Sequence, residues 1–164
     1  MYVKTIYQSP IGPMSLVAGD KGLRGVWFED QKFFERGLDE KPVLGSHPIL
    51  DQTSLLLDAY FSGQDVDFSS LTLEAIGTEF QEKVWRLLKE IPHGQTTNYG
   101  RLAQQLGLRS GQAIGGAVGR NPYSIIVPCH RVLNQKGQLT GYAGGLDKKI
   151  WLLQHENLHF EVKK

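Results

Sequence analysis

Three short runs of mostly apolar residues near the start of the chain, separated by turn signals, have the pattern of extended strands. The runs cover residues 3–7, 14–18 and 23–28. Residues that favour turns separate them, among them Pro10, Gly12 and Gly22. Over residues 48–61 the apolar spacing becomes that of a helix, which Gly63 is expected to end. The pattern therefore predicts an antiparallel meander followed by one helix.

A helix with a clear start is predicted in the middle of the chain. Thr78 and Gln81 stand three residues apart before an apolar stripe, as the two partners of a capping box do. The stripe runs to Ile91, and Gly94 is expected to end the helix. Residues 65–77, which precede it, have no sustained helical period and are expected to form a last strand or an extended linker.

Two shorter helices are expected at about residues 98–106 and 111–119, with a glycine-containing turn between them and Ser110 as the cap of the second. This arrangement is the pattern of a helix-turn-helix, although it is also common where two helices merely pack. The second helix contains the segment Gln112-Ala113-Ile114-Gly115-Gly116-Ala117, which is poor in long side chains. Each glycine costs a helix about 1 kcal/mol relative to alanine. Either close helix packing or the close approach of a ligand would account for the missing bulk.

Together these elements predict an α+β protein of two domains, with the boundary near residue 76. Residues 1–75 are expected to form an antiparallel sheet plus a helix. Residues 76–164 are expected to form a mainly helical domain that contains the helix-turn-helix. A length of 164 residues, of which 40% are hydrophobic, suits one domain or two small ones.

The two predicted domains differ in charge, although the whole chain has a formal net charge of only +1. Residues 1–75 carry 6 Lys and Arg against 11 Asp and Glu, which gives −5, and residues 76–164 carry 12 against 6, which gives +6. No acidic residue stands between Glu90 and Asp147. This stretch is a candidate surface for a polyanion, and a solvated basic face without a partner is the alternative.

Cys129 is the only cysteine, which excludes an internal disulfide and a multi-cysteine zinc cage within the chain. A lone thiol favours a reducing compartment. No apolar run approaches the roughly 18 residues that span a bilayer, and the N-terminal segment lacks the basic and apolar regions of a signal peptide. We therefore expect a soluble, cytoplasmic protein with no membrane partner.

Cys129 stands in an apolar segment, residues 125–132, which predicts a strand interrupted by Pro128. Proline cannot donate to a strand ladder, so the thiol is expected at the edge of an element. An isolated cysteine is usually an inert, buried side chain. His130 and Arg131 follow directly, however, and cationic neighbours favour the thiolate, which is the nucleophilic form.

The sequence around this cysteine resembles the O6-alkylguanine-DNA alkyltransferase family over about residues 78–157. The resemblance rests on Pro128-Cys129-His130-Arg131-Val132, Gly115-Gly116-Ala117, Asn121-Pro122, Gly141-Tyr142-Ala143-Gly144-Gly145 and Trp151-Leu152-Leu153-Gln154-His155-Glu156. Over residues 1–75 it rests mainly on Ser9-Pro10-Ile11-Gly12-Pro13, and it implies a ribonuclease H-like domain there. It implies direct-reversal DNA repair, in which the alkyl group of O6-alkylguanine or O4-alkylthymine moves irreversibly to cysteine after base flipping through the minor groove.

The resemblance implies catalytic roles for five residues. Cys129 is the alkyl acceptor, His130 activates its thiol through a water, and Glu156 orients and charges the imidazole. Tyr99 crowds the 3′ phosphate of the target nucleotide and helps to protonate the leaving guanine. Asn121 joins the reading helix to the active-site segment.

The resemblance also implies contacts with the DNA and the flipped base. Tyr142, Ala143, Gly144 and Gly145 are expected to cover the alkylguanine pocket, and the carbonyl of Val127 is expected to accept a hydrogen bond from the guanine amine. The residues expected to bind DNA are Gln112, Ala113, Gly115, Arg120 and Arg131. Small residues on the helix predicted at residues 111–119 suit a minor-groove approach.

One position departs from the family pattern. Gln112 stands where family members usually carry an arginine that inserts into the base stack, and glutamine carries no charge. The turn before it is one residue shorter, so Arg109 is a partial substitute for that arginine. We therefore expect slower or weaker repair than an arginine-bearing relative shows.

No cofactor and no metal are expected, and a thioether product implies that each molecule reacts once. The expected partner is double-stranded DNA that carries O6-alkylguanine. The protein is expected to be a monomer in solution, and cooperative assembly on DNA is left open as an alternative to binding as single molecules. A second function that stays open is binding of alkylated DNA with little repair. A third is a cysteine hydrolase, since Cys, His and an acid also serve acyl transfer. Cys129 and His130 would point to opposite faces of a strand, which argues against the hydrolase.

Overall fold

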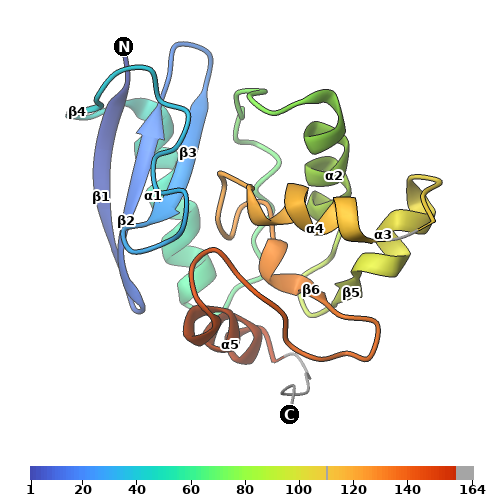
Figure 1. The fold of residues 1–164 in the computed structure, drawn as a ribbon. Coiled ribbons are helices and arrows are strands. Elements are labelled where there is room, and N and C mark those ends of the chain that lie inside the picture. Colours follow the sequence, from blue (N-terminus) through green and yellow to red (C-terminus); the bar gives the residue numbers. More distant parts are fainter. Residues whose placement is uncertain (110, 158–164) are drawn as a thin grey trace. The chain divides into compact units, whose positions relative to one another are not determined.

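The computed structural model describes residues 1–109 and 111–157 (Figure 1). The chain divides into two compact units, Met1–Ile76 and Gly77–Lys164. Within the described residues, the first unit holds a four-stranded sheet and one helix, and the second holds helices α2 to α5 with a two-stranded pair. The predicted α+β class is confirmed. Ser110, the predicted helix cap, lies outside the described residues.

The sheet of the first unit is built on the predicted meander. β1 (Val3–Ser9), β2 (Gly12–Ala18) and β3 (Leu23–Phe28) pair antiparallel in chain order. Gly12 follows the first turn with φ +122°, a conformation that favours glycine. The sequence missed β4 (Val43–Leu44), which pairs parallel with β1 and completes the order β3-β2-β1-β4. A strand of two residues is too short for periodicity to reveal.

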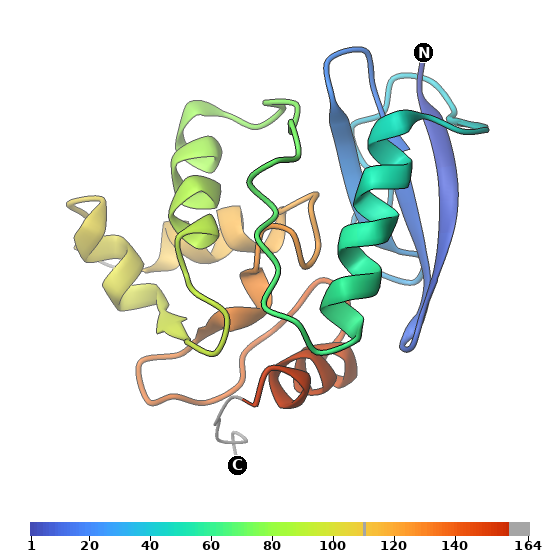
Figure 2. The same cartoon turned by 180° about the vertical axis from the view of Figure 1, so that it is seen from behind.

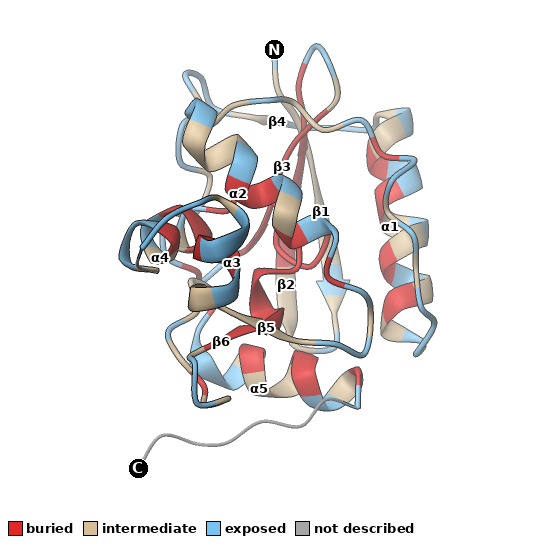
Figure 3. Cartoon of the chain, turned by 90° about the vertical axis from the view of Figure 1, so that its right-hand side faces the viewer, coloured by how far each residue is buried: buried red, intermediate tan, exposed pale blue. Residues whose placement is uncertain are grey.

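Helix α1 (Pro48–Phe61) lies against this sheet and has the predicted bounds (Figure 2). His47 caps its start, because its Nδ1 accepts the N–H of Ile49 at 3.1 Å. The core of the unit lies between α1 and the sheet, where β3 is buried along its whole length (Figure 3). The segment before α2 is extended, and its Leu73 forms an isolated parallel bridge with Leu23.

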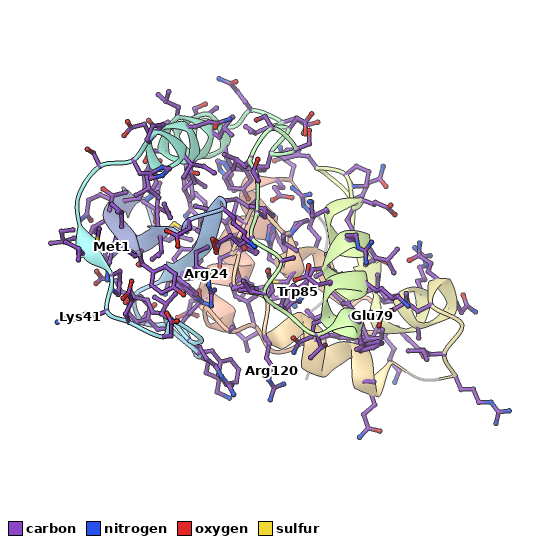
Figure 4. All side chains as sticks on the ribbon, turned by 90° about the horizontal axis from the view of Figure 1, so that it is seen from above. Met1, Arg24, Lys41, Glu79, Trp85 and Arg120 are labelled. Atoms are coloured by element: carbon purple, nitrogen blue, oxygen red, sulfur yellow. The ribbon has the colours of Figure 1, made fainter. Side chains whose placement is uncertain are left out.

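Helix α2 (Glu79–Lys89) opens the second unit with the predicted capping box. Thr78 Oγ1 accepts the N–H of Gln81 at 3.1 Å, and Gln81 Oε1 accepts the N–H of Thr78 at 3.0 Å. The side chain of Trp85 points inward (Figure 4), where its Nε1 donates to the carbonyl of Ala117 at 2.8 Å. This bond attaches α2 to the second helix of the predicted helix-turn-helix.

The helix-turn-helix consists of α3 (Tyr99–Gln105) and α4 (Gln112–Gly119). Asn98 caps α3 through its Oδ1, which accepts the N–H of Arg101 at 2.9 Å. Gly107, in the turn between the helices, has φ +73°. Both helices were predicted to within a residue or two at each end.

Two parts of the second unit were not predicted. One is α5 (Leu146–His155), whose N-cap residue is Gly145, with φ +100°, and which has no side-chain cap that the sequence could reveal. The other is the parallel pair of β5 (Thr97–Asn98) with β6 (Val132–Leu133), whose partners are far apart in the chain. No helix within the described residues is both long and apolar enough to cross a membrane.

The predicted strand over residues 125–132 is wrong. Ile125 has φ +71°, and the N–H groups of Ile126 and Val127 bond back to the carbonyls of Ser124 and Tyr123, as in tight turns. A 3-10 turn, η1 (Cys129–Arg131), follows, and only β6 is extended. The run is apolar because all of it is buried, and a short apolar run does not by itself distinguish a strand from a buried turn.

Candidate active site

Tight turns fix the backbone on both sides of Cys129. Pro128, with φ −80° and ψ 65°, is the centre of an inverse γ-turn in which the Cys129 N–H donates to the Val127 carbonyl at 2.8 Å. The N–H of Arg131 then bonds to the Pro128 carbonyl at 3.0 Å. Cys129 itself is buried. The sulfur is therefore held in place by the backbone before any substrate binds.

Asn121 ties this loop together. Its Nδ2 donates to the Val127 carbonyl at 2.8 Å, and its Oδ1 accepts the N–H of Tyr123 at 2.9 Å. The side chain thus links the end of α4 to the turn that carries Cys129. The Val127 carbonyl accepts from both Asn121 and Cys129, and its expected contact with a guanine amine stays a prediction.

Glu156 forms two buried hydrogen bonds just after α5. Its Oε2 lies 2.6 Å from His130 Nε2, and its Oε1 lies 2.7 Å from Arg131 Nε. Burial alone raises the pKa of Glu156, but the hydrogen bonds and charges of His130 and Arg131 outweigh burial and hold this pKa well below its usual range. The carboxylate is therefore ionised at neutral pH.

Arg131 does not lie at a DNA surface, which corrects the expectation for this residue. Besides its contact with Glu156, its Nη1 donates to the Ile91 carbonyl at 2.7 Å. The residue is buried. Its guanidinium supports the carboxylate that holds His130, so its role is positioning.

His130 is fully buried and presents one ring nitrogen as a base. Since Nε2 donates to Glu156, Nδ1 carries the lone pair, and Nδ1 has no partner within the described part of the chain. Burial lowers the pKa of His130 despite the raising effect of Glu156, so the ring is neutral at rest. In a 3-10 turn neighbouring side chains diverge by about a third of a turn. No hydrogen bond joins Cys129 to His130 among the described residues.

The electrostatics of Cys129 also differ from expectation. Burial raises the pKa of the thiol, while the Asn121 side chain and the charge of Lys149 lower it. The predicted cationic neighbours do not ionise it, because His130 is neutral and Arg131 is paired with Glu156. At rest the sulfur is a protonated thiol, and a base must remove its proton before reaction.

Lys149 is a buried cation that the sequence analysis missed. It stands on α5 with 1% of its surface exposed, and its Nζ donates to the Val132 carbonyl at 2.7 Å and to Thr140 Oγ1 at 3.4 Å. Burial lowers its pKa to about 8, and the charge of Cys129 acts in the opposite direction. The sequence contains a signal for this burial, because Lys149 stands three and four residues before Leu152 and Leu153 and so shares their face of a helix.

Two tyrosines complete the surroundings of the sulfur. The Tyr99 hydroxyl lies 3.0 Å from Thr140 Oγ1, which links it to Lys149. Burial raises the pKa of both Tyr99 and Tyr142, and the charge of Cys129 raises each of them further. Tyr142 opens a turn in which its carbonyl accepts the N–H of Gly145 at 2.9 Å. Side chains from α3, from this turn and from α5 therefore converge on Cys129.

The remaining expected DNA contacts lie on α4. Gln112, Ala113, Gly116 and Arg120 are exposed along it, and Gly115 is half-buried. Arg120 Nη1 donates to the Gly116 carbonyl at 3.2 Å, so its side chain lies along α4. A Cβ added at Gly115 would meet only Tyr99, at 4.0 Å, and one at Gly116 would meet only Arg120, at 3.6 Å. Packing within the described residues does not require these glycines, which favours the close approach of a ligand.

These features define a class of protein: a helix-turn-helix domain in which a buried cysteine stands next to a histidine whose ring is held by a carboxylate. No group of three or more His, Cys, Asp or Glu residues in residues 1–109 and 111–157 is arranged to hold a metal ion. Comparison with known proteins identifies the family within this class.

The chain belongs to the methylated-DNA–protein-cysteine methyltransferase family. The family model described as the DNA binding domain of 6-O-methylguanine DNA methyltransferase matches residues 79–158. The model described as the ribonuclease-like domain of that protein matches residues 2–75.

Relatives and solved structures agree with this assignment. The methylated-DNA–protein-cysteine methyltransferase of Methanosarcina acetivorans is 40% identical over 166 residues, covering 92% of this chain and 96% of the relative. That of Mycobacterium leprae is 42% identical over 149 residues, covering 90% and 88%. The crystal structure of the Mycobacterium tuberculosis O6-methylguanine methyltransferase matches with a TM-score of 0.81 and 36% identity over 95% of this chain and 93% of that one. A structure of the M. tuberculosis protein in complex with DNA matches with a TM-score of 0.79 and 37% identity over 94% and 91%.

Proposed function

We propose that this protein repairs O6-alkylguanine in double-stranded DNA by transferring the alkyl group to Cys129, once per molecule. The observation that carries this proposal is the buried Cys129 next to His130, whose ring Glu156 holds with Nδ1 as the free base. The names of the relatives describe the same transfer, from methylated DNA to a protein cysteine. O4-alkylthymine carries the same kind of alkyl ether and is a second substrate.

The proposed reaction is a single displacement at the alkyl carbon. His130 Nδ1 takes the thiol proton, directly or through one water, because burial keeps Cys129 protonated until then. The sulfur forms a bond to the alkyl carbon, and the bond from that carbon to the guanine oxygen breaks with its electron pair. Tyr99 donates a proton to the leaving guanine, and Lys149 stabilises the transient thiolate. The thioether product cannot be reversed by thiol exchange.

Access to the sulfur requires that the damaged nucleotide leave the duplex. A stacked base cannot bring its alkyl carbon to a buried thiol, and extrusion costs a few kcal/mol. The exposed face of α4, with its small residues, is proposed to lie in the minor groove while the base enters beside Tyr142. We further propose that the protein acts as a monomer in the cytoplasm, on chromosomal DNA.

Intact-mass measurement after incubation with a duplex that carries one O6-methylguanine tests this function. The protein should gain the mass of one CH2 unit, located on Cys129 by peptide mapping, and the DNA should lose it. Cys129→Ser should bind the duplex and gain nothing. A hydrolase would show no lasting gain, and a pure binding protein would shift the duplex without reacting. DNA that keeps its methyl group after incubation with an excess of wild-type protein would end the proposal.

The exposed Gly116 on α4 gives a prediction in which the free energy of unfolding and the affinity for DNA change in opposite directions. Gly116→Ala should raise the free energy of unfolding by about 1 kcal/mol, since helix propensity improves and the new Cβ meets only Arg120. The same methyl group should weaken DNA binding several-fold, because it lies on the face of α4 that is proposed to enter the minor groove. Denaturant unfolding and fluorescence anisotropy measure the two effects. Reaction with free O6-benzylguanine, which needs no DNA, should not change; equal DNA affinity of both proteins would contradict the assignment of this face.

The alternative of a DNA-binding protein with little repair rests on Gln112. This residue is exposed at the first position of α4, where an uncharged side chain holds the base stack open more weakly than an arginine. Gln112→Arg should therefore tighten DNA binding and speed repair, both by about tenfold. Gln105→Arg, at another exposed position, controls for added charge. If Gln112→Arg leaves both DNA affinity and repair rate unchanged, the inference about Gln112 is wrong.

A further inference from the structure

An open cleft of about 320 Å³ lies beside α3 and shares none of its lining with the residues around Cys129. The lining contains two arginines, three amide side chains, two glycines and a leucine, and it contains no acidic residue. α3 and the turn toward α4 supply the arginines, and the loop after β6 supplies one amide. The cleft is thus rich in hydrogen-bond donors.

The two arginines of the cleft, Arg101 and Arg109, have no counterion in the described part of the chain. Neither forms an ion pair there, and no acidic residue occurs between Glu90 and Asp147. Two uncompensated cations at one cleft repel each other, and an anion between them removes that repulsion. A guanidinium group donates two parallel hydrogen bonds to phosphate oxygens, so phosphate is the anion that this pair suits best.

The amide groups of the cleft are held as further donors. Asn98 uses its Oδ1 to cap α3, which leaves its NH2 group without a partner among the described residues. Gln135 lies so close above Gly100 that a Cβ at this glycine would collide with Gln135 Nε2. Asn134 stiffens the turn below Gln135, because its Oδ1 accepts the N–H groups of Lys136 and Gln138, each at 2.9 Å. The donors are therefore positioned before a ligand arrives.

Tyr99 connects this cleft with the acceptor site. Gly100, which follows Tyr99, lines the cleft, and so does Gly111, at which a Cβ would collide with the backbone and Cβ of Tyr99. The hydroxyl at the other end of Tyr99 reaches Thr140. The main chain of Tyr99 thus borders the cleft, and its hydroxyl lies among the side chains that surround Cys129. A strand that presents its flipped nucleotide to Cys129 would bring a neighbouring phosphate to the cleft.

We propose that this cleft binds one backbone phosphate of the damaged strand, close to the extruded nucleotide, through Arg101 and Arg109. The site supplies from α3 and the following turn the positive charge that Gln112 does not supply from α4. It anchors the strand on one side of Tyr99 while the nucleotide rotates. The inference rests on the proposed repair of DNA, and it adds a phosphate site to it.

The first test measures how the affinity for an undamaged duplex depends on salt. The double variant Arg101→Gln/Arg109→Gln should bind about tenfold more weakly at low salt. Its slope of log affinity against log salt should fall by about 0.9, the value for one phosphate. Arg101→Lys/Arg109→Lys, which keeps the charge, should retain the slope. Arg86→Gln, an exposed arginine on α2, should match the wild type. An unchanged slope and affinity in the double glutamine variant would overturn the proposal.

A second test identifies the phosphate. Single phosphates near the O6-methylguanine are replaced by neutral methylphosphonates. At one position close to the lesion the wild type should lose affinity, and the double glutamine variant, which is already weakened, should lose little more. If the two proteins respond equally at every position, the cleft does not hold a phosphate.

Reaction with free O6-benzylguanine separates these outcomes from failure of the proposed function. The double variant should react with the free base at the wild-type rate, because the cleft is not part of the acceptor site. Loss of this reaction as well would mean a structural role for the arginines and would reject the phosphate site. A wild type that transfers no alkyl group from DNA or from the free base would instead reject the proposed function.

Discussion

Replacing Glu156 by glutamine is expected to slow alkyl transfer to Cys129 by a factor of about a hundred or more. The carboxylate fixes the His130 ring with Nδ1 as the base and stabilises the imidazolium that forms when the thiol proton is taken. A glutamine can present its NH2 group to Nε2, which would favour the wrong tautomer. Single-turnover rates with O6-methylguanine DNA and with free O6-benzylguanine should fall alike, because both reactions need the thiolate.

The same substitution should also destabilise the second unit by about 3 to 5 kcal/mol, since it leaves Arg131 buried without its carboxylate. The pKa of Glu156 is lower in the folded chain than its ordinary value of 4.5. Its contribution to stability is therefore complete above about pH 4.5 and is lost as the pH falls toward the folded pKa. This acid-sensitive part of the unfolding free energy should be absent in the variant.

Glu90→Gln is the matched control for Glu156, because Glu90 is an exposed carboxylate in the same unit. It should leave both the rate and the acid sensitivity as in the wild type. A Glu156→Gln protein that folds and transfers the alkyl group at the wild-type rate would contradict the role given to the carboxylate.

Replacing Lys149 by methionine is expected to slow transfer about tenfold or more while making the protein more stable. The Lys149 charge lowers the pKa of the Cys129 thiol, and methionine removes that help. Holding the buried ammonium charged with a pKa of about 8, against an ordinary 10.5, costs about 3 kcal/mol at neutral pH. Loss of the hydrogen bond to the Val132 carbonyl offsets part of that gain, by about 1 to 3 kcal/mol. The net gain in the free energy of unfolding should be about 1 kcal/mol.

The pH dependence distinguishes this charge effect from simple repacking. The pKa of Lys149 is lower in the folded chain than in the unfolded chain, so the wild type gains stability as the pH rises from about 8 to 10.5. The methionine variant should lack this rise in the free energy of unfolding. The wild-type transfer rate should fall toward that of the methionine variant as the pH rises through about 8, where Lys149 loses its charge. Lys89→Met, at an exposed position on α2, should change neither profile. A Lys149→Met protein with the wild-type pH–rate profile would refute the electrostatic role.

The resting state of the site suits a protein with a single acceptor. A buried, protonated thiol is a poor nucleophile and a poor target for oxidants, so the fold protects Cys129 in the resting protein. In the proposed reaction the thiol is activated by His130 Nδ1 and by the Lys149 charge, and the fold already holds both groups in place. These groups therefore need no rearrangement before the proposed single reaction of Cys129.

The sequence by itself determined the elements whose signals are local. The extended runs within residues 3–28, the turn at Gly12 and the capping box of Thr78 with Gln81 each depend on neighbours within a few positions, and the structure has all of them. The motif around Cys129 likewise indicated the family before any contact was known, because its residues are contiguous. Local backbone preferences and a short motif are properties that a linear sequence carries.

Only the tertiary structure decided what depends on burial and on partners far apart in the chain. An arginine in a basic stretch of sequence predicts a DNA contact. In the structure Arg131 is buried and donates a hydrogen bond to Glu156, which is 25 residues away in the chain. Lys149 becomes a partner of the thiol only because α5 packs against the turn of Cys129. Residues 125–132 are apolar because they are buried, and their turns follow from bonds to Asn121 and Tyr123 that no periodicity encodes. The charge state of each group in the site depends on desolvation, which is set by the whole surrounding fold.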